Sequence, residues 1–570
     1  MSVSLPDGVS SPVSLNVPSR SVRAVHALLD EPLEWAWLDV REQGRFDQGH
    51  PFWAVNAPLS RLERLAPALV PRLATPLVLM DDGEPDDDLA LRAATRLRQW
   101  GYTDVSLLDG GLRAWRQAGL PVHAGVNVPS KAFGEFIECL EGTPTIEVQQ
   151  LLDWQEQGRD VLLIDCRPFD EYHRASLPGS INCPGVELVS RIFDLVRRPD
   201  TALVIHCAGR TRGIIAAQSL IDLGVKNPVF TLRNGLGDWY LQGRPFSRGN
   251  RQVVPPAGPL GLQRALEAVY ALALRFGVRL IDQRGLADLQ ADLARTTFLF
   301  DVRSPEEFEA GHLPGARSAP GGQLVQTLDA YVGTRGARIV LCDDSGARAC
   351  LTAAWLLQMG CTEVMVLQGG IAAVEAALVR GPAAPHWPLA LPSPQPPCIT
   401  VMALHEGLQP GARISDGQAI AVLDLSSSQA FAASHIPGAW FAVRSRLRDV
   451  LGQLPPHGLL VLTSEDGCHA QLSHAEAQSL SAAPVRVLSG GNAAWAAAGL
   501  PLGGGTQRLT TTPDDIWYSP LDRPDPVAAV REYLRWEIAL NDVLVLERGV
   551  RFRRAPAADS APTGRTLEKS

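Results

Sequence analysis

Cys207 is the residue of this sequence whose type and position most clearly suggest a catalytic role. It follows the apolar run 203–205 closely and opens a loop, residues 208–213, that contains two arginines. The run predicts a buried parallel strand, and residues 214–220 predict a helix. A loop that joins a strand to a helix directs several backbone N–H groups at one point, and such a point binds anions. The pattern therefore predicts an anion site headed by a thiol.

The surroundings of this thiol favour a nucleophile. The N–H groups, the helix dipole and the guanidinium groups of Arg210 and Arg212 would stabilise a thiolate. Two arginines in so short a loop also indicate a small dianion as the bound species. The alternative for Cys207 is the common role of a lone cysteine, which is a small buried hydrophobic side chain.

Composition narrows the class of protein. A chain of 570 residues predicts about four domains, and a net charge of −9 argues against nucleic acid or an anionic membrane as partner. The N-terminal segment has no apolar core, so we expect no signal peptide. Nine cysteines without a C-x-x-C motif predict neither a zinc cluster nor a disulfide framework. We therefore expect a cytoplasmic protein with no cofactor.

An internal pattern recurs four times along the chain. Each copy opens with an apolar run ending in aspartate, and a second apolar run ends at a loop 42 residues later in three copies and 40 in the fourth. A third run ends in Gly-Gly or Asn-Gly, and a tryptophan follows in three copies. The opening aspartates are Asp39, Asp165, Asp301 and Asp424, and the first loop residues are Asp81, Cys207, Asp343 and Ser464.

Helix-like segments separate the apolar runs, which predicts an α/β fold with a parallel sheet covered by helices on both faces. Each repeat has the length of one compact domain. Segments 126–134 and 380–397 are expected to be linkers, the second extended because it is rich in proline. We place the four units at residues 20–125, 140–248, 278–382 and 399–505.

A helical C-terminal extension is predicted at residues 513–554, with a helix over 526–548. Val527, Val530, Leu534 and Ile538 would share one face of this helix. We expect that face to dock onto the fourth unit rather than to form a dimer. Residues 555–570 are expected to be disordered.

The repeat resembles the rhodanese sulfurtransferase family. The third unit has the opening motif, from Asp301-Val302-Arg303 to Gly311-His312-Leu313-Pro314-Gly315-Ala316, and the second has the cysteine-headed loop. The resemblance covers roughly residues 20–505. It implies that Cys207 attacks the outer sulfur of a donor and becomes a persulfide. It also implies that the persulfide and the anionic end of the donor are bound by the backbone of Ala208, Gly209, Arg210, Thr211 and Arg212.

Only the second unit is expected to be active. The other loops begin with Asp81, Asp343 and Ser464, and the first of them carries six carboxylates over residues 81–88. Cys342 lies one position before the loop and should point elsewhere. Our hypothesis is that Asp81 and Asp343 fill their own anion sites.

The expected function is transfer of sulfur from thiosulfate to a thiophilic acceptor, which is cyanide, a small thiol or a protein thiol. One alternative donor is 3-mercaptopyruvate. A related phosphatase or arsenate reductase would use Cys-x5-Arg, but here that position is Gly213 and Arg212 falls one residue short. A sulfur-relay scaffold also stays open. Asp165, Arg167 and Glu171 are expected to form a structural ion-pair network.

Overall fold

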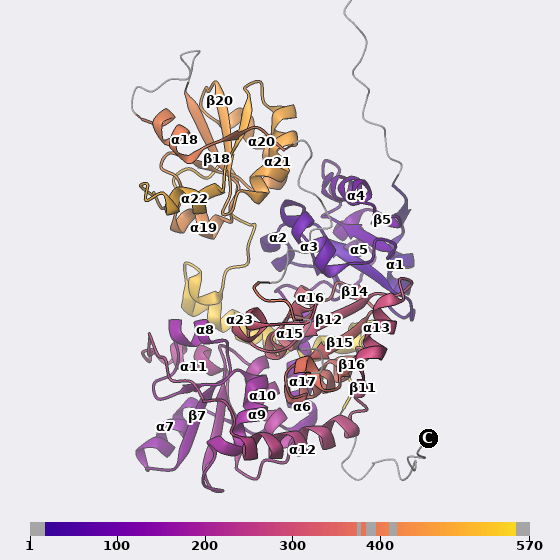
Figure 1. Ribbon diagram of the computed structural model, residues 1–570, viewed down its shortest axis with the longest axis vertical. Helices are drawn as coiled ribbons and strands as arrows, with labels where there is room; N and C mark the ends of the chain where they lie inside the picture. The colour runs from indigo at the N-terminus through magenta and orange to yellow at the C-terminus, as the bar shows by residue number, and fades with distance from the viewer. Residues whose placement is uncertain (1–16, 373–377, 383–394, 410–418, 555–570) are drawn as a thin grey trace, which may run out of the picture.

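The computed structural model describes residues 17–372, 378–382, 395–409 and 419–554, and it contains four α/β units (Figure 1). The predicted fold class is confirmed, because each unit is built on a parallel sheet with helices on its faces. The strand order in the second unit is β6-β10-β9-β7-β8, and the third and fourth units repeat it. The strands are short, and central strands such as β9 are fully buried because helices cover both faces of the sheet.

The first and second units contain these elements. The first has β1 (Ser19–Arg20), α1 (Val22–Leu28), β2 (Trp35–Asp39), α2 (Gln43–Asp47), β3 (Val55–Asn56), α3 (Leu62–Leu69), β4 (Leu77–Met80), α4 (Leu89–Gln99), β5 (Val105–Leu108) and α5 (Gly111–Gln117). The second has β6 (Thr145–Ile146), α7 (Val148–Glu156), β7 (Val161–Asp165), α8 (Phe169–Arg174), β8 (Ile181–Asn182), α9 (Gly185–Leu195), β9 (Ala202–His206), α10 (Thr211–Asp222), β10 (Val229–Leu232) and α11 (Gly235–Leu241).

The third and fourth units repeat the alternation. The third has β11 (Arg279–Ile281), α13 (Gln283–Ala291), β12 (Thr297–Asp301), α14 (Pro305–Ala310), β13 (Arg317–Ser318), α15 (Gly321–Gln326), α16 (Leu328–Tyr331), β14 (Thr334–Arg335), β15 (Arg338–Cys342), α17 (Ala347–Gln358) and β16 (Val364–Leu367). The fourth has β17 (Cys398–Ile399), α18 (Val401–Gly407), β18 (Ile420–Asp424), α19 (Ser428–Ala433), β19 (Trp440–Phe441), α20 (Leu447–Val450), β20 (Leu459–Thr463), α21 (Cys468–Leu480), β21 (Val485–Leu488) and α22 (Gly491–Ala497).

The second and third units pack against each other through equivalent elements. The N-terminus of α10 reaches α15, where Arg212 Nη1 lies 3.4 Å from Gln323 Oε1. The N-terminus of α17 reaches α9 in the same way, with Arg348 Nη1 2.5 Å from Glu187 Oε1. Helix α12 (Pro259–Arg275) packs against both α9 and α17. The loop after β9 therefore lies at the interface between these two units.

The first unit contacts both the third and the fourth. Strand β14 of the third unit adds to the first sheet, antiparallel to β2. On the fourth unit, Arg444 forms a buried ion pair with Glu63, at 2.7 Å from Arg444 Nη1 to Glu63 Oε2. Glu63 belongs to α3, and Arg444 begins the 3-10 turn Arg444–Arg446. The four units thus form one connected assembly.

One prediction about the segments between units was wrong. The expected linker 126–134 is mostly the start of a buried helix, α6 (Val128–Glu141), because Pro129 is suited to a helix N-terminus and apolar residues follow at helical spacing. Part of the segment 380–397, and all of 555–570, lie outside the described residues.

The C-terminal extension was predicted to be helical, and α23 (Pro526–Val543) confirms this. Its docking site was predicted wrongly. From the fourth unit the chain crosses to the second, and α23 packs on α6 and α11 (Figure 1). Val530 and Leu534 are buried there, whereas Val527 and Ile538 are 38% and 47% exposed. The buried face includes Glu537 instead, because contact with a polar loop can satisfy a carboxylate that an apolar sheet could not.

Candidate active site

The loop after β9 places the Cys207 side chain against backbone amides. The N–H groups of Gly209 and Gly213 are directed at the thiol and act to lower its pKa, and the residue is 2% exposed. Loop residues 208–210 join β9 to α10, as the apolar run and the helical pattern predicted. The thiol thus faces the N–H groups, and it also borders the apolar core that the second and third units share.

The glycine that closes each repeat lets two backbone segments meet. Gly235 adopts φ +47°, and a Cβ there would lie 2.2 Å from the carbonyl oxygen of Cys207. Gly370 and Gly491 approach the carbonyls of Asp343 and Ser464 equally closely. Only glycine fits such a position. This close approach explains why a glycine recurs at this position of the repeat. At this position the chain packs against the backbone of the loop.

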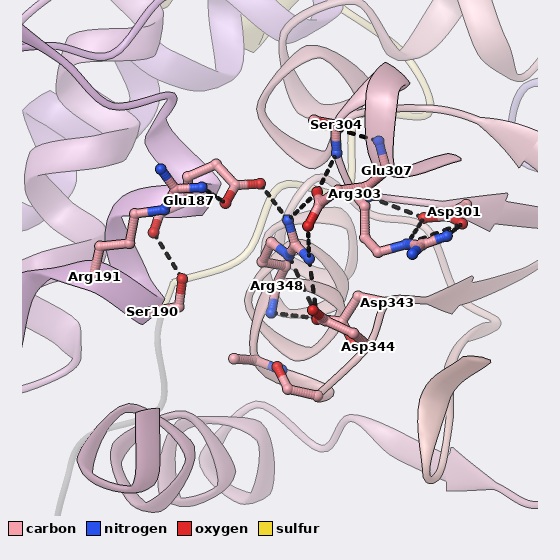
Figure 2. A network of polar contacts seen from close by, with 12 residues as sticks. Glu187, Ser190, Arg191, Asp301, Arg303, Ser304, Glu307, Asp343, Asp344 and Arg348 are labelled. Atoms are coloured by element: carbon pink, nitrogen blue, oxygen red, sulfur yellow. Dashed lines mark hydrogen bonds and ion pairs between the residues drawn. The ribbon is translucent and has the colours of Figure 1, made fainter. Parts of the chain in front are cut away.

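The corresponding loops in the first and third units bind their own carboxylates, which confirms the hypothesis drawn from the sequence. Asp343 accepts hydrogen bonds from the N–H groups of Gly346 and Arg348, the latter at 2.8 Å (Figure 2). Asp81 accepts from Gly83 at 3.0 Å and from Ala90 at 2.9 Å. The same loop geometry therefore donates N–H groups to a carboxyl side chain in both units, and these contacts oppose the effect of burial, which raises the pKa of each aspartate to about 6.

Replacing Asp343 by alanine should destabilise the third unit. The substitution leaves buried N–H groups without an acceptor, at a cost of about 1–3 kcal/mol in the free energy of unfolding. Thermal unfolding of the whole protein, followed by circular dichroism, should show a lower midpoint. The D343N variant keeps an acceptor oxygen and should lose less; equal losses in both variants would contradict this role.

Arg212 is paired rather than open to a ligand. Its Nη1 and Nη2 lie 2.7 and 2.9 Å from the Glu171 carboxylate. Arg348 makes the same pair with Glu307 in the third unit, at 2.7 Å (Figure 2). Because the third unit has no cysteine at its loop, this pair is a feature of the repeat. It positions the loop, and its charge still lowers the pKa of Cys207.

Arg210 is paired as well. Its Nε lies 2.7 Å from Glu135 Oε1, and its other nitrogens contact Glu138 and Asn234. Burial raises the pKa of Glu135 to about 7, opposed by Arg210. Arg210 is therefore not free for a dianion, contrary to the prediction from the sequence, because helix α6 brings Glu135 and Glu138 to it and residue spacing could not reveal these contacts.

The expected network at the end of β7 is present. Arg167 Nη2 lies 2.6 Å from Asp165 Oδ2, and both side chains are almost fully buried. The pKa of Asp165 is held below its usual value, with His206 and Arg167 outweighing the effect of burial. Arg303 and Asp301 repeat the pair at 2.6 Å in a unit without the cysteine. A structural role is therefore sufficient for this network.

Helix α23 covers the loop that contains Cys207. Val530 and Leu534 pack over Gly237 of α11. One turn further on, Glu537 Oε1 accepts a hydrogen bond of 2.9 Å from the Thr211 hydroxyl. Its Oε2 is buried with no hydrogen-bond partner among the described residues, and a Cβ on Gly209 would lie 2.9 Å from it. A buried carboxylate thus lies directly on the candidate site.

A buried lysine completes the surroundings. Lys131 of α6 places its Nζ 4.9 Å from the ring centre of Tyr533 and 4.7 Å from that of Trp536, both on α23. Trp517 adds a third ring at 5.6 Å. Burial lowers the pKa of Lys131 to about 8, opposed by Glu537. These contacts fasten α23 to α6 through cation–π interactions.

The predicted thiolate is not the form that this arrangement favours. Burial raises the pKa of the Cys207 thiol above its ordinary value, and Glu537 raises it further, while Arg212 and the N–H groups of Gly213 and Gly209 act in the opposite direction. The sequence-based prediction considered the groups that stabilise a thiolate, and it did not consider burial or Glu537. With α23 in place, burial is the largest effect and the thiol is the expected state.

Cys342 and Ser464 lie at the junction between strand and loop in the third and fourth units, as the repeat predicts. Cys342 is fully buried at the end of β15, and burial raises its pKa strongly. In the fourth loop, Ser464 Oγ accepts a hydrogen bond of 3.4 Å from the Ala470 N–H. Among the described residues, no helix is both long and apolar enough to span a bilayer.

Sequence reasoning missed Lys131, Glu135 and Glu537. A weak signal existed for Glu537, which continues the helical spacing of Val530 and Leu534. Lys131 and Glu135 lie in or beside the segment taken for a linker, so their apolar neighbours at helical spacing were the available signal.

Comparison with known proteins agrees with this architecture. Four segments match the Rhodanese-like domain family, at residues 21–118, 147–242, 285–377 and 411–498. A solved structure of a thiosulfate sulfurtransferase from Pseudomonas aeruginosa is 42% identical with a TM-score of 0.89, covering 94% of this chain and 99% of that one.

Curated relatives match single parts of the chain. Human 3-mercaptopyruvate sulfurtransferase is 29% identical over 21% of this chain and 42% of its own length. An HTH-type transcriptional regulator from Mycobacterium tuberculosis is 33% identical over 18% of this chain and 43% of its own length. The chain thus spans less than half of each of these two relatives. The four family matches together cover more than half of the sequence, and the chain therefore belongs to the rhodanese-like family, with four such domains in tandem.

Proposed function

We propose that the protein is a sulfurtransferase that moves the outer sulfur of thiosulfate to a thiophilic acceptor through a persulfide on Cys207. One observation carries the proposal: the loop geometry that binds a carboxylate in the first and third units presents its N–H groups to a thiol in the second. Similarity to the Pseudomonas aeruginosa thiosulfate sulfurtransferase over nearly the whole chain supports this donor.

The reaction needs two half-reactions on one sulfur atom. Cys207 loses its proton, and its sulfur attacks the outer sulfur of thiosulfate. The sulfur–sulfur bond of the donor breaks, and sulfite leaves with the electron pair. A nucleophilic acceptor then attacks the outer sulfur of the persulfide, and the Cys207 thiolate is regenerated. The N–H groups of Gly209 and Gly213 would stabilise the negative charge in both steps.

Donor access requires a change in the covering segment. Cys207 and Glu537 are 2% and 1% exposed, so the described arrangement is closed over the sulfur. Helix α23 lies directly on the loop, and it belongs to the C-terminal extension rather than to one of the four units. We propose that displacement of α23 opens the site, and that the three other units are catalytically inactive.

A second donor, 3-mercaptopyruvate, is favoured by one specific observation. Arg210 and Arg212 are each neutralised by carboxylates, which weakens the electrostatic case for a dianion. Several curated relatives are named 3-mercaptopyruvate sulfurtransferase. A monoanionic donor would meet less repulsion from Glu537.

Steady-state thiocyanate formation from cyanide tests the proposal. Each donor is varied against cyanide at several fixed concentrations. Parallel double-reciprocal lines with thiosulfate, at a higher kcat/KM than with 3-mercaptopyruvate, are expected for a two-step transfer. Preference for 3-mercaptopyruvate would reassign the donor, and turnover with neither would favour the sulfur-relay scaffold.

A further inference from the structure

A second cavity, separate from the loop of Cys207, lies between the first and third units. Its volume is about 430 Å³, which is within the range of small-molecule sites. Residues near the C-terminal end of the described chain, Gly549 and Arg551, contribute to its wall. The apolar part of the lining comes from Leu33, Phe52, Val55, Leu328, Val332 and Met359.

One cation on this wall has no ion-pair partner among the described residues. Arg335, at the end of β14, stacks over Trp53 with its guanidinium carbon 4.1 Å from the ring centre. The side chain is half-buried. Burial lowers its pKa to about 10, and the charge of Arg551 acts in the same direction, while Cys361 and Asp30 oppose the shift. Because no carboxylate in this part of the chain pairs with this guanidinium, it can accept an anionic partner from the cavity.

The other charges on the wall differ in how they are paired. Arg295 and Glu363 pair with each other at 2.7 Å. Burial raises the pKa of Asp329 to about 6, opposed by the charge of Lys131, and its Oδ1 has no hydrogen-bond partner among the described residues. Glu31 is exposed, and Arg551 donates to the backbone carbonyl of Asp30 at 3.0 Å. Arg335 and Arg551 are therefore two cations of this wall for which the described residues provide no ion pair.

The apolar wall is also incompletely covered. Leu33 is 60% exposed although it lies beside buried Phe52. An exposed apolar surface next to an unpaired guanidinium matches a ligand with an apolar body and one anionic group. Thiosulfate itself does not fit this description, because it has no apolar part.

We propose that this cavity binds a small organic anion, with the anionic group on Arg335 and the apolar body along the side chains of Val332 and Leu328. The position is independent of Cys207, so the proposal does not depend on the sulfur transfer reaction. The shared chemistry is that of a carboxylate or sulfonate on an aliphatic or aromatic body.

Isothermal titration calorimetry on the full-length protein tests the proposal with three probes. Octanoate carries both features, octan-1-ol lacks the charge, and acetate lacks the apolar body. Octanoate should bind saturably and at least about tenfold more tightly than either of the others, as expected for a charge-assisted contact in a buried site. Equal binding of octanoate and octan-1-ol, or no saturable octanoate binding, would overturn the proposal.

Variants locate the binding. R335M should weaken octanoate binding by about tenfold or more, because it removes the guanidinium and keeps an apolar side chain. R284M makes the same change at an exposed arginine of the third unit and should leave octanoate binding unchanged. V332F should fill the cavity and abolish octanoate binding. Unchanged octanoate affinity in both R335M and V332F would overturn the assignment.

Discussion

Replacing Cys207 by serine is expected to reduce sulfur transfer by about 10³-fold or more. A serine hydroxyl in the loop would still accept the N–H groups of Gly209 and Gly213, so the loop should keep its shape. The hydroxyl, however, is a poor nucleophile without a base and does not form the persulfide. The rate of thiocyanate formation at saturating thiosulfate measures the loss.

Two matched variants control for the loss of a thiol elsewhere. Cys342 is buried in β15, and Cys468 begins α21 beside the loop of the fourth unit. C342S and C468S should keep kcat within about twofold of the wild type. If C207S retains substantial turnover and C468S loses it, the fourth unit is the active one and the assignment to the second is wrong.

Neutralising Glu537 should increase the rate of the reaction with thiosulfate. The E537Q substitution keeps an oxygen that accepts from Thr211 but removes a negative charge beside the sulfur and the donor site. We expect kcat/KM for thiosulfate to rise about tenfold, since a like charge at this distance in a buried site repels a dianion. E532Q changes an exposed glutamate on the same helix and should have no effect.

The pH dependence of alkylation separates this effect from a change in helix packing. Iodoacetamide reacts with the thiolate, so its rate at Cys207 rises with pH as the thiol ionises. In the wild type the midpoint should lie above the ordinary cysteine pKa of 9.0, because burial and Glu537 raise it. In E537Q the midpoint should move to lower pH. A large loss of activity in E537Q would instead make Glu537 the base that accepts the thiol proton.

The sequence was sufficient to predict the fold and the loop because both depend on local patterns. The apolar run 203–205, the loop and the helical pattern 214–220 that position Cys207 span fewer than 20 consecutive residues. The glycine that ends the repeat is required because its backbone lies against the carbonyl of Cys207. The same patterns predicted that Asp81 and Asp343 would fill the corresponding loops, and the hydrogen bonds of both carboxylates confirm it.

The groups that modify the site depend on tertiary contacts and could not be predicted. Glu537 and Thr211 are 326 positions apart, and Arg210 and Glu135 are 75 apart. No spacing rule links such residues. The C-terminal helix was predicted, but its partner was not, because an amphipathic face specifies that a helix packs and not where.

Mass spectrometry of the protein after incubation with thiosulfate shows which cysteine carries the transferred sulfur. The sample is desalted without reductant and digested, and the peptide that contains Cys207 is compared with those of the other cysteines. We expect one added sulfur atom on Cys207, which disappears on addition of cyanide. Added sulfur on another cysteine, or none on Cys207 at full donor saturation, would contradict it.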